Sequence, residues 1–325
     1  MKLVNFGRSG LKVTEYCLGC LTMGSLQSNL STEVGASIIT TAVENGINFI
    51  DTAEIYGNDA QINLALDILR KKSPELLENL VIATKTKAQT ADEMDDFVER
   101  TRKNFNKESL DIVCLHNIAD ENAFLEREAA YTRALELKDE GMISEIGWTA
   151  HSFEGLKPVL DHADGVSVIM PIINFKGFGL RGYTQDDLLN LLKEAKNKQI
   201  YVYSMKSLGG GHLRESIEEA IKWLRENPLV DVAAVGAKSP AEVLMNIYLF
   251  NDEPVPAEIR EKIENVPRHI IIYHNLCQKC GKCAEACTSG AMSFSEKEGP
   301  VIDHESCVIC GYCAEACPKF IIRVV

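Results

Sequence analysis

Two runs of cysteines near the end of the chain have the spacing and the thiol chemistry of an iron–sulfur site. Eight of the 11 cysteines lie between Cys277 and Cys317, and the segment CGKCAEAC recurs 30 residues later as CGYCAEAC. In each run three thiols recur at every third residue, so one tight turn can offer them to three irons of a cubane. The fourth iron needs a thiolate from elsewhere in the chain.

Both runs follow the pattern C-x2-C-x2-C-x3-C, which is typical of bacterial ferredoxins with two [4Fe–4S] clusters. In that arrangement the fourth cysteine of each run ligates the cluster of the other run. We therefore expect one cluster to be held by Cys277, Cys280, Cys283 and Cys317, and the other by Cys307, Cys310, Cys313 and Cys287. Gly281 and Gly311 are expected to let the backbone approach the sulfides closely.

A zinc site is the alternative for clustered cysteines. A zinc ribbon, however, uses four ligands in two well-separated C-x2-C knuckles, and eight cysteines in two close runs exceed that need. Thr288 stands where Pro318 follows the second run, a difference that leaves the ligands untouched. The remaining cysteines, Cys17, Cys20 and Cys114, lie in apolar strand-like segments and are expected to be buried in the core.

Four other groups with useful chemistry follow runs of strand-forming residues. Asp51, Lys85 and His116 end three successive predicted strands, and Tyr56 follows Asp51 in DTAEIYG. Tyr56 could protonate a carbonyl oxygen if its pKa falls below its usual value of about 10, and a neighbouring Lys85 ammonium would lower it. Asp51 would hold Lys85 in place, and His116 could orient and polarise the carbonyl. Four such groups on consecutive strand ends predict carbonyl reduction or alcohol oxidation.

The first 250 residues alternate β-rich runs with helical stretches, as is needed to bring those strand ends together. The predicted strands are 15–20, 47–51, 80–85, 110–116, 144–149, 165–173, 200–206 and 231–236, and the predicted helices are 32–45, 60–72, 91–104, 126–140, 154–162, 185–198, 215–226 and 240–250. Eight strand–helix pairs indicate an α/β fold of the (β/α)8 TIM-barrel type, whose active sites lie at the C-terminal ends of the strands. A doubly wound dinucleotide-binding sheet, the alternative fold, typically has the motif G-x-G-x-x-G after its first strand. The segment CLGCLTMG does not match this motif, so the barrel is favoured.

Several helix ends carry their own signals. Thr90 with Glu93 predicts a capping box, and Ser239-Pro240 with Glu242 predicts an N-cap, a proline at the first helical position and a second box. Gly46 and Gly141 are placed as C-terminal stops.

With these motifs, residues 1–250 resemble the aldo-keto reductase superfamily. The segments similar to that family are GRSGLKVTEYCLGCLTMG, DTAEIYG, MKSLGGGHL and AVGAKSPAEVLMNI. The family's catalytic tetrad carries over as Asp51, Tyr56, Lys85 and His116. The resemblance implies a nicotinamide cofactor, usually NADPH, extended across the mouth of the barrel.

The resemblance also implies the contacts of that cofactor. Its ribose near the nicotinamide would meet Thr22 and Met23, its pyrophosphate Met205, Leu208 and Gly210, and its adenosine end Lys238, Ser239, Glu242 and Asn246. The loops after strands seven and eight are the usual phosphate site of such barrels, and a helix capped by Ser239 offers N–H groups to an anion. At the nicotinamide end the family's Ser-Asn pair is replaced by Thr149-Ala150, and its Gln by Met170 with Asn174 nearby. His151, which follows, has two interpretations: a contact beside His116 or a rim residue.

Residues 251–267 contain three prolines and a short charged helix, so they are expected to join two domains. We predict the aldo-keto reductase-like barrel over residues 1–265 and a small C-terminal α+β ferredoxin-like domain over residues 266–325. The first strand of the second domain is expected in the segment HIIIY.

Composition limits the possible partners. The chain of 325 residues has a net charge of −13, which argues against a nucleic-acid partner because phosphate neutralisation needs clustered Lys and Arg. No apolar run approaches the roughly 18 residues of a membrane span, and the N-terminus lacks a secretory core, so we expect a cytoplasmic protein without a membrane partner. Any anionic cofactor must then be held by local positive groups.

The pairing of the two chemistries raises a question of electron flow. A hydride carries two electrons and a cubane accepts one, and no flavin motif is visible, so the substrate, a partner flavoprotein or neither could link the two halves. We predict an iron–sulfur oxidoreductase that interconverts a small-molecule carbonyl and alcohol with NADP(H). The alternatives are an electron-transfer subunit whose barrel is a non-catalytic scaffold for a redox partner, and a reductase whose clusters are purely structural.

Overall fold

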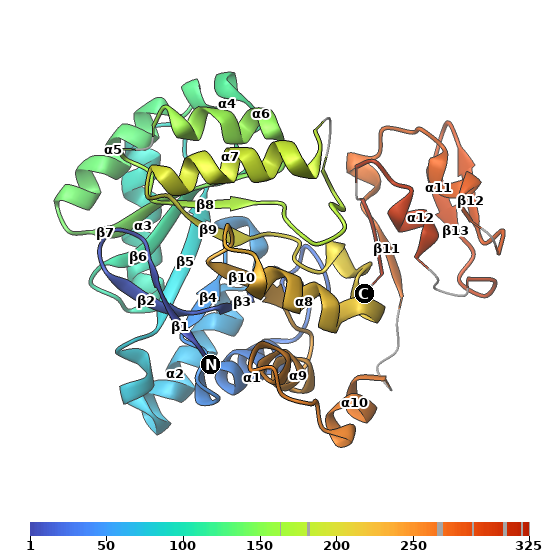
Figure 1. The fold of residues 1–325 in the computed structure, drawn as a ribbon, viewed down its shortest axis with the longest axis horizontal. Helices are drawn as coiled ribbons and strands as arrows, with labels where there is room; N and C mark the ends of the chain where they lie inside the picture. The colour runs from blue at the N-terminus through green and yellow to red at the C-terminus, as the bar shows by residue number, and fades with distance from the viewer. Residues whose placement is uncertain are drawn as a thin grey trace.

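Eight parallel strands form a closed barrel, which confirms the predicted (β/α)8 fold (Figure 1). The computed structural model describes all residues except 163, 181–182, 265–268, 288, 308–310, 320 and 325, and the side chains of residues 264 and 315. The barrel strands are β3 (Tyr16–Gly19), β4 (Phe49–Asp51), β5 (Val81–Thr86), β6 (Leu110–Leu115), β7 (Ile143–Ala150), β8 (Val168–Pro171), β9 (Tyr201–Ser204) and β10 (Val232–Gly236). Strands β10 and β3 pair in parallel and close the cylinder.

Alternation along the strands divides the core into two parts. On β6, Ile112 and Cys114 point into the barrel, whereas Val113 and Leu115 pack outward against the helices. This is the period of two that a strand imposes on its side chains. Cys17, Cys20 and Cys114 are fully buried, as predicted for core residues.

The helices cover the outside of the barrel, and the predicted helix ends are largely confirmed. They are α1 (Thr32–Glu44), α2 (Asp59–Lys72), α3 (Ala91–Phe105), α4 (Glu121–Leu125), α5 (Glu128–Asp139), α6 (Phe153–Leu156), α7 (Gln185–Asn197), α8 (Ile217–Glu226), α9 (Pro240–Phe250) and α10 (Ala257–Glu264). Thr90 and Glu93 form the predicted box. At α9, Ser239 caps the helix, but the Glu242 carboxylate accepts from the N–H of Lys238 instead of the N–H of Ser239. No helix within the described residues is long and apolar enough to cross a membrane.

An N-terminal hairpin, which the sequence analysis did not predict, closes the bottom of the barrel. Its strands β1 (Leu3–Phe6) and β2 (Leu11–Thr14) pair in an antiparallel manner, and Phe6 packs edge to face on Tyr203 inside the barrel. The fully buried carboxylate of Glu145, on β7, accepts hydrogen bonds from the Ser9 N–H and the Ser167 hydroxyl. The bottom is therefore sealed, and access to the interior is left to the opposite, C-terminal end.

The C-terminal segment forms a small second core. Strand β11 (Ile270–Ile272) pairs with β14 (Ile322–Val324), and β12 (Met292–Ser295) pairs with β13 (Gly299–Ile302). Two short helices, α11 (Lys282–Glu285) and α12 (Tyr312–Glu315), each follow a glycine in the left-handed region. The expected first strand is thus present as β11, while the predicted boundary at residue 265 lies outside the described residues.

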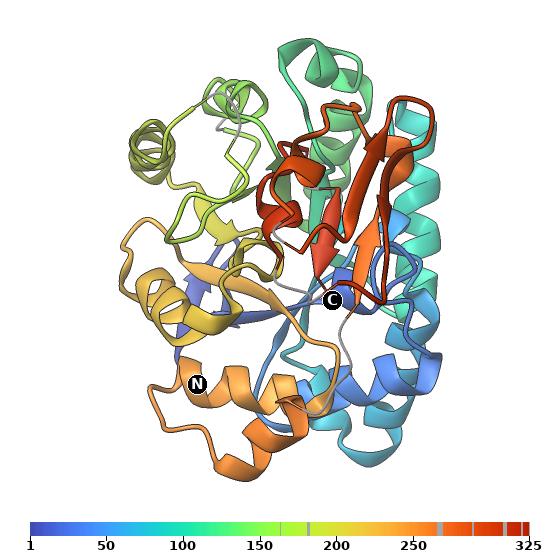
Figure 2. The ribbon, with the colours of Figure 1, turned by 90° about the vertical axis from the view of Figure 1, so that its right-hand side faces the viewer.

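This second core lies against the C-terminal end of the barrel (Figures 1 and 2). The hydroxyl of Tyr273, just after β11, donates to the carbonyl of Leu26 in the loop that follows β3. Strand β14 contacts the 3-10 turn Gly209–Gly211, in the loop that follows β9. Both contacts involve the end of the barrel where chemistry takes place in this fold.

Candidate active site and cluster site

The Lys85 ammonium is the centre of the polar group at the mouth of the barrel. It lies 2.6 Å from Asp51 Oδ1, donates to the carbonyl of Thr52 at 2.7 Å and approaches the hydroxyl of Tyr56 at 3.2 Å. Lys85 is only 1% exposed. Neighbouring strands β4 and β5 therefore supply the carboxylate and the ammonium, and the turn after β4 supplies the phenol.

The pKa values of this group are set by burial and by the mutual contacts of its members. Burial alone would lower the pKa of Lys85, but Asp51 and Tyr56 outweigh it and raise that pKa above the ordinary value. Burial raises the pKa of Tyr56 to about 12, although the Lys85 ammonium lowers it. The expected net decrease at Tyr56 is therefore wrong, because removal of the phenol from water outweighs the lysine. Tyr56 keeps its proton at neutral pH, as a general acid requires.

Tyr203 is a member of this group that the sequence analysis missed. Its hydroxyl donates to Asp51 Oδ1 at 3.2 Å from inside the barrel and lies 3.6 Å from Cys114 Sγ. A buried carboxylate needs more than one donor, so a tyrosine on an inward-facing strand position was the signal that could have revealed it.

His116 lies at the end of β6 with its ring 5.8 Å from the ring of Tyr56. Burial, with a smaller contribution from Lys85, lowers the pKa of His116 to about 2, so the imidazole is neutral at pH 7. Its Nδ1 is buried and has no hydrogen-bond partner within the described part of the chain. A polar atom of this kind at the mouth of a barrel fits a polar group of a substrate.

The loop after β7 lies beside His116. His151 Nδ1 is 2.7 Å from Asn117 Oδ1, a contact that is compatible with both interpretations of His151. Thr149 Oγ1 accepts from the Asn117 N–H at 2.8 Å, so Thr149 fixes the segment that carries His116.

Some of the predicted coenzyme residues lie along an open edge of the mouth. Partly exposed residues lie in the loops after β3, β9 and β10 and in the first turn of α9: Thr22, Met205, Leu208, Gly210, Lys238, Ser239 and Glu242. A Cβ on Gly236 would lie 1.9 Å from Thr22 Oγ1, and a Cβ on Gly210 would have only one described neighbour within 4 Å. The absence of a side chain at Gly236 makes room for Thr22, and its absence at Gly210 leaves backbone that an anionic coenzyme could approach.

Other predicted coenzyme residues are engaged inside the protein. Asn174 donates to the carbonyl of Phe178 and accepts from the N–H of the same residue, both at 2.9 Å. Asn246 donates to Tyr16 Oη at 3.2 Å, and Met23 is fully buried. Asn174 thus holds its own loop, Asn246 joins α9 to β3, and Met23 packs in the core.

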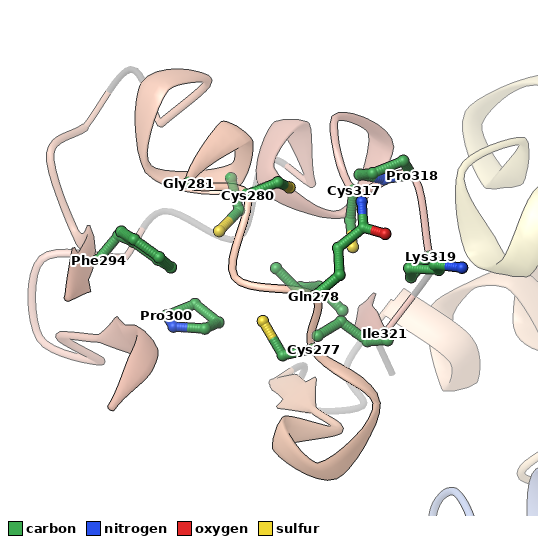
Figure 3. Close-up of a pocket in the computed structure, with 12 residues that line it drawn as sticks. Cys277, Gln278, Cys280, Gly281, Phe294, Pro300, Cys317, Pro318, Lys319 and Ile321 are labelled. Carbon is green, nitrogen blue, oxygen red and sulfur yellow. The ribbon is translucent and has the colours of Figure 1, made fainter. Parts of the chain in front are cut away.

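The predicted ligands of one cluster surround a common cavity. Cys277, Cys280, Cys283 and Cys317 line it, together with apolar residues that include Phe294 and Ile322 (Figure 3). The backbone N–H of Lys279 donates to Cys277 Sγ at 3.3 Å, a contact that stabilises a thiolate. Four thiols around this cavity suit the donor set of a cubane.

The second run is only partly described. Cys287 Sγ accepts from the N–H of Met292 at 3.2 Å, and hydrogen bonds from Ser289 and Met292 lower the pKa of this thiol. Cys307 and Cys313 are described, whereas Cys310 lies outside the described residues. Gly281 and Gly311 have φ values of 73° and 85°, which only glycine adopts without strain.

Comparison with family models identifies both parts of the chain. A model described as the aldo/keto reductase family matches residues 15–220, and a model described as a 4Fe-4S dicluster domain matches residues 276–321. The second match confirms a ferredoxin-type segment with iron–sulfur chemistry.

Individual relatives are more distant. The chain is 25% identical over 240 residues to YqkF of Bacillus subtilis, an uncharacterized oxidoreductase, with 70% of this chain and 72% of the relative covered. A Pseudomonas aeruginosa protein with an aldo-keto reductase designation, PA4992, has a TM-score of 0.63 at 21% identity over 77% of this chain and 95% of its own. The aldo-keto reductase AKR11C1 of Bacillus halodurans, in its holo form, has a TM-score of 0.63 at 20% identity over 81% and 95%. These structures share the barrel fold.

Burial of a neutral His116 predicts a loss of stability in acid. Because the folded-state pKa of about 2 lies below the ordinary value of 6.5, protonation favours the unfolded chain as the pH falls below 6.5. We expect His116→Gln to remove about 2 kcal/mol of the decrease in unfolding free energy between pH 7 and pH 5. Urea unfolding of both proteins at the two pH values measures this difference, and parallel decreases would contradict it.

Because Tyr203 donates a hydrogen bond to Asp51, we expect removal of its hydroxyl to lower the stability of the protein. We expect Tyr203→Phe to lower the unfolding free energy by about 1.5–3 kcal/mol, the range for a hydrogen bond to a charged group. Tyr201→Phe, on the same strand and away from Asp51, is the matched control and should cost less than about 0.5 kcal/mol. Equal effects of the two variants in urea unfolding would show that the hydroxyl does not support Asp51.

Proposed function

Because this chain belongs to the aldo/keto reductase family and carries a 4Fe-4S ferredoxin-type segment, we propose that it interconverts a small-molecule carbonyl and alcohol with NADP(H) as hydride donor or acceptor. The observation that carries this proposal is the buried contact of Lys85 with both Asp51 and Tyr56 at the mouth of the barrel. Reduction of a carbonyl needs a proton donor close to the carbonyl oxygen, and the phenol of Tyr56 at the barrel mouth is suited to be that donor.

The roles of the side chains follow from their contacts. Tyr56 gives its proton to the carbonyl oxygen in reduction and takes it back in oxidation. Lys85 lies 3.2 Å from the phenol oxygen and stabilises the negative charge that develops there. Asp51 keeps Lys85 charged and in place, and the neutral His116 orients the oxygen through its ring. The bound nicotinamide supplies or accepts the hydride.

We infer the coenzyme contacts from the same open edge. Lys238 and Ser239 precede α9 and are suited to the adenosine end, and Lys238 is suited to a 2′-phosphate. The glycine-containing loop after β9 is suited to the diphosphate, and Thr22 lies where the nicotinamide ribose would pass. The net charge of −13 makes such local cations necessary for an anionic coenzyme.

We propose two [4Fe–4S] clusters in the C-terminal domain, with the boundary near residue 265. The cavity lined by Cys277, Cys280, Cys283 and Cys317 supports the first ligand set. The similar sequence of the second run supports a second set of Cys307, Cys310, Cys313 and Cys287. Electron exchange between the one-electron clusters and the two-electron hydride would then need a mediator, for which a flavoprotein partner is one candidate.

Replacement of the phenol tests the carbonyl chemistry. We expect Tyr56→Phe to lower kcat of NADPH-dependent reduction of a panel of aldehydes and ketones by at least about 100-fold, since loss of a general acid typically costs that factor. NADPH affinity and iron content should be unchanged, because the hydroxyl faces Lys85 and not the coenzyme edge. A wild-type protein that binds no nicotinamide coenzyme would instead favour the barrel as a non-catalytic scaffold.

Replacement of single cysteines tests the ligand sets. We expect Cys317→Ser and Cys287→Ser each to lose about half of the iron and to leave different EPR signals after reduction with dithionite, since each removes the fourth ligand of a different cluster. Cys17→Ala, in the barrel interior, is the matched control and should keep its full iron content. Identical EPR signals from the two serine variants would contradict the exchange of the fourth cysteine.

A further inference from the structure

Strand β14 lies directly on the glycine turn after β9. The carbonyl oxygen of Val324 is 3.1 Å from the position that a Cβ on Gly211 would take. The guanidinium Nη1 of Arg323 is 3.6 Å from the corresponding position on Gly210. These are contacts between the C-terminal domain and the barrel, separated by more than 100 residues in the chain.

The position that a side chain on Gly210 would take has one close neighbour beyond the turn itself. A Cβ there would meet no described heavy atom within 4 Å except Arg323 Nη1. The turn has φ values of 58°, 70° and 104° at Gly209, Gly210 and Gly211, so it is built from conformations that suit glycine. The backbone of Gly209–Gly211 therefore forms a small surface without side chains, called the glycine floor here, and the Arg323 guanidinium lies at its edge.

Tyr273 connects this floor to the opposite loop. Its hydroxyl donates to the carbonyl of Leu26, and its phenol lies close enough to Arg323 for the guanidinium to lower its pKa against the increase that burial causes. Arg323 therefore lies in the same partly buried interface as the loop that carries Thr22.

From these contacts we propose that Arg323, a residue of the C-terminal domain, binds the diphosphate of the dinucleotide coenzyme held by the barrel. The inference rests on the proposed function, because it needs a dinucleotide that crosses the mouth along the turn Gly209–Gly211. A guanidinium can give two parallel N–H···O bonds to a diphosphate. The open space beside Arg323 above Gly210 is where such oxygens would lie.

The residues on either side of Arg323 contact the cluster cavity and the barrel. Ile322 lines the cavity of Cys277, Cys280, Cys283 and Cys317, and Val324 contacts the barrel. Three consecutive residues thus join the cluster cavity to the glycine floor. The two domains together complete one dinucleotide site.

The test measures binding, not turnover. Isothermal titration under anaerobic conditions would give the affinity of the iron-loaded protein for NADPH and for adenosine 2′-monophosphate, which lacks the diphosphate. We expect Arg323→Gln to weaken NADPH binding by about 10-fold or more and to leave adenosine 2′-monophosphate binding unchanged. Lys297→Gln, an exposed cation in the turn between β12 and β13, is the matched control for charge. Iron content and the cluster EPR signal show that each variant is intact.

The outcomes separate the inference from the proposed function. If the wild type binds neither ligand, the proposed function fails. If the wild type binds NADPH and Arg323→Gln binds it equally well, Arg323 does not contact the diphosphate and the inference is wrong. Tighter binding by Arg323→Gln also overturns it, since β14 would then compete with the coenzyme. Partial recovery in Arg323→Lys would support a charge-dependent contact.

Discussion

The burial of one ammonium group constrains the whole mouth of the barrel. Lys85 is 1% exposed, and removal of one partner from a buried ion pair typically costs about 3–5 kcal/mol, so Asp51 must lie beside it. Asp51 in turn needs a second donor, which Tyr203 supplies from a third strand. Only a closed barrel brings β4, β5 and β9 around one point. The contacts among Asp51, Lys85 and Tyr203 therefore depend on the closure of the barrel.

Local sequence patterns were sufficient to predict the strands and the helix ends, because these depend on neighbouring residues in the chain. The eight barrel strands were found because each is a short apolar run between helical stretches with caps such as Thr90 and stops such as Gly46. The N-terminal hairpin was missed because its strands are four residues each and, of their apolar side chains, only Phe6 and Val13 are fully buried. The barrel accounts for the proximity of Asp51, Tyr56 and Lys85, since side chains at the ends of parallel strands meet at one edge.

Other features of the site depend on contacts between distant parts of the chain, which the sequence does not reveal. The expected decrease in the pKa of Tyr56 considered only its neighbour Lys85, whereas the depth of burial is known only from the fold. Asn174 and Asn246 are suggested as coenzyme contacts by the sequence, and the fold adds partners that the sequence does not reveal: Phe178 in the same loop for Asn174 and Tyr16 on β3 for Asn246. The contact of Tyr273 with Leu26 joins residues 247 positions apart, and no periodicity or spacing signals it.

The small core of the C-terminal domain is built partly from its own thiols. Cys283, Cys313 and Cys317 are buried in it with Ile270 and Ile322. A segment of this size buries little apolar surface, so we expect the binding of iron and sulfide by these thiols to stabilise the core. Since β14 belongs to that core and contacts the barrel, we expect the surface that meets the barrel to depend on delivery of the metal. Iron supply in the cell would then determine the fraction of molecules in which β14 is docked on the C-terminal end of the barrel.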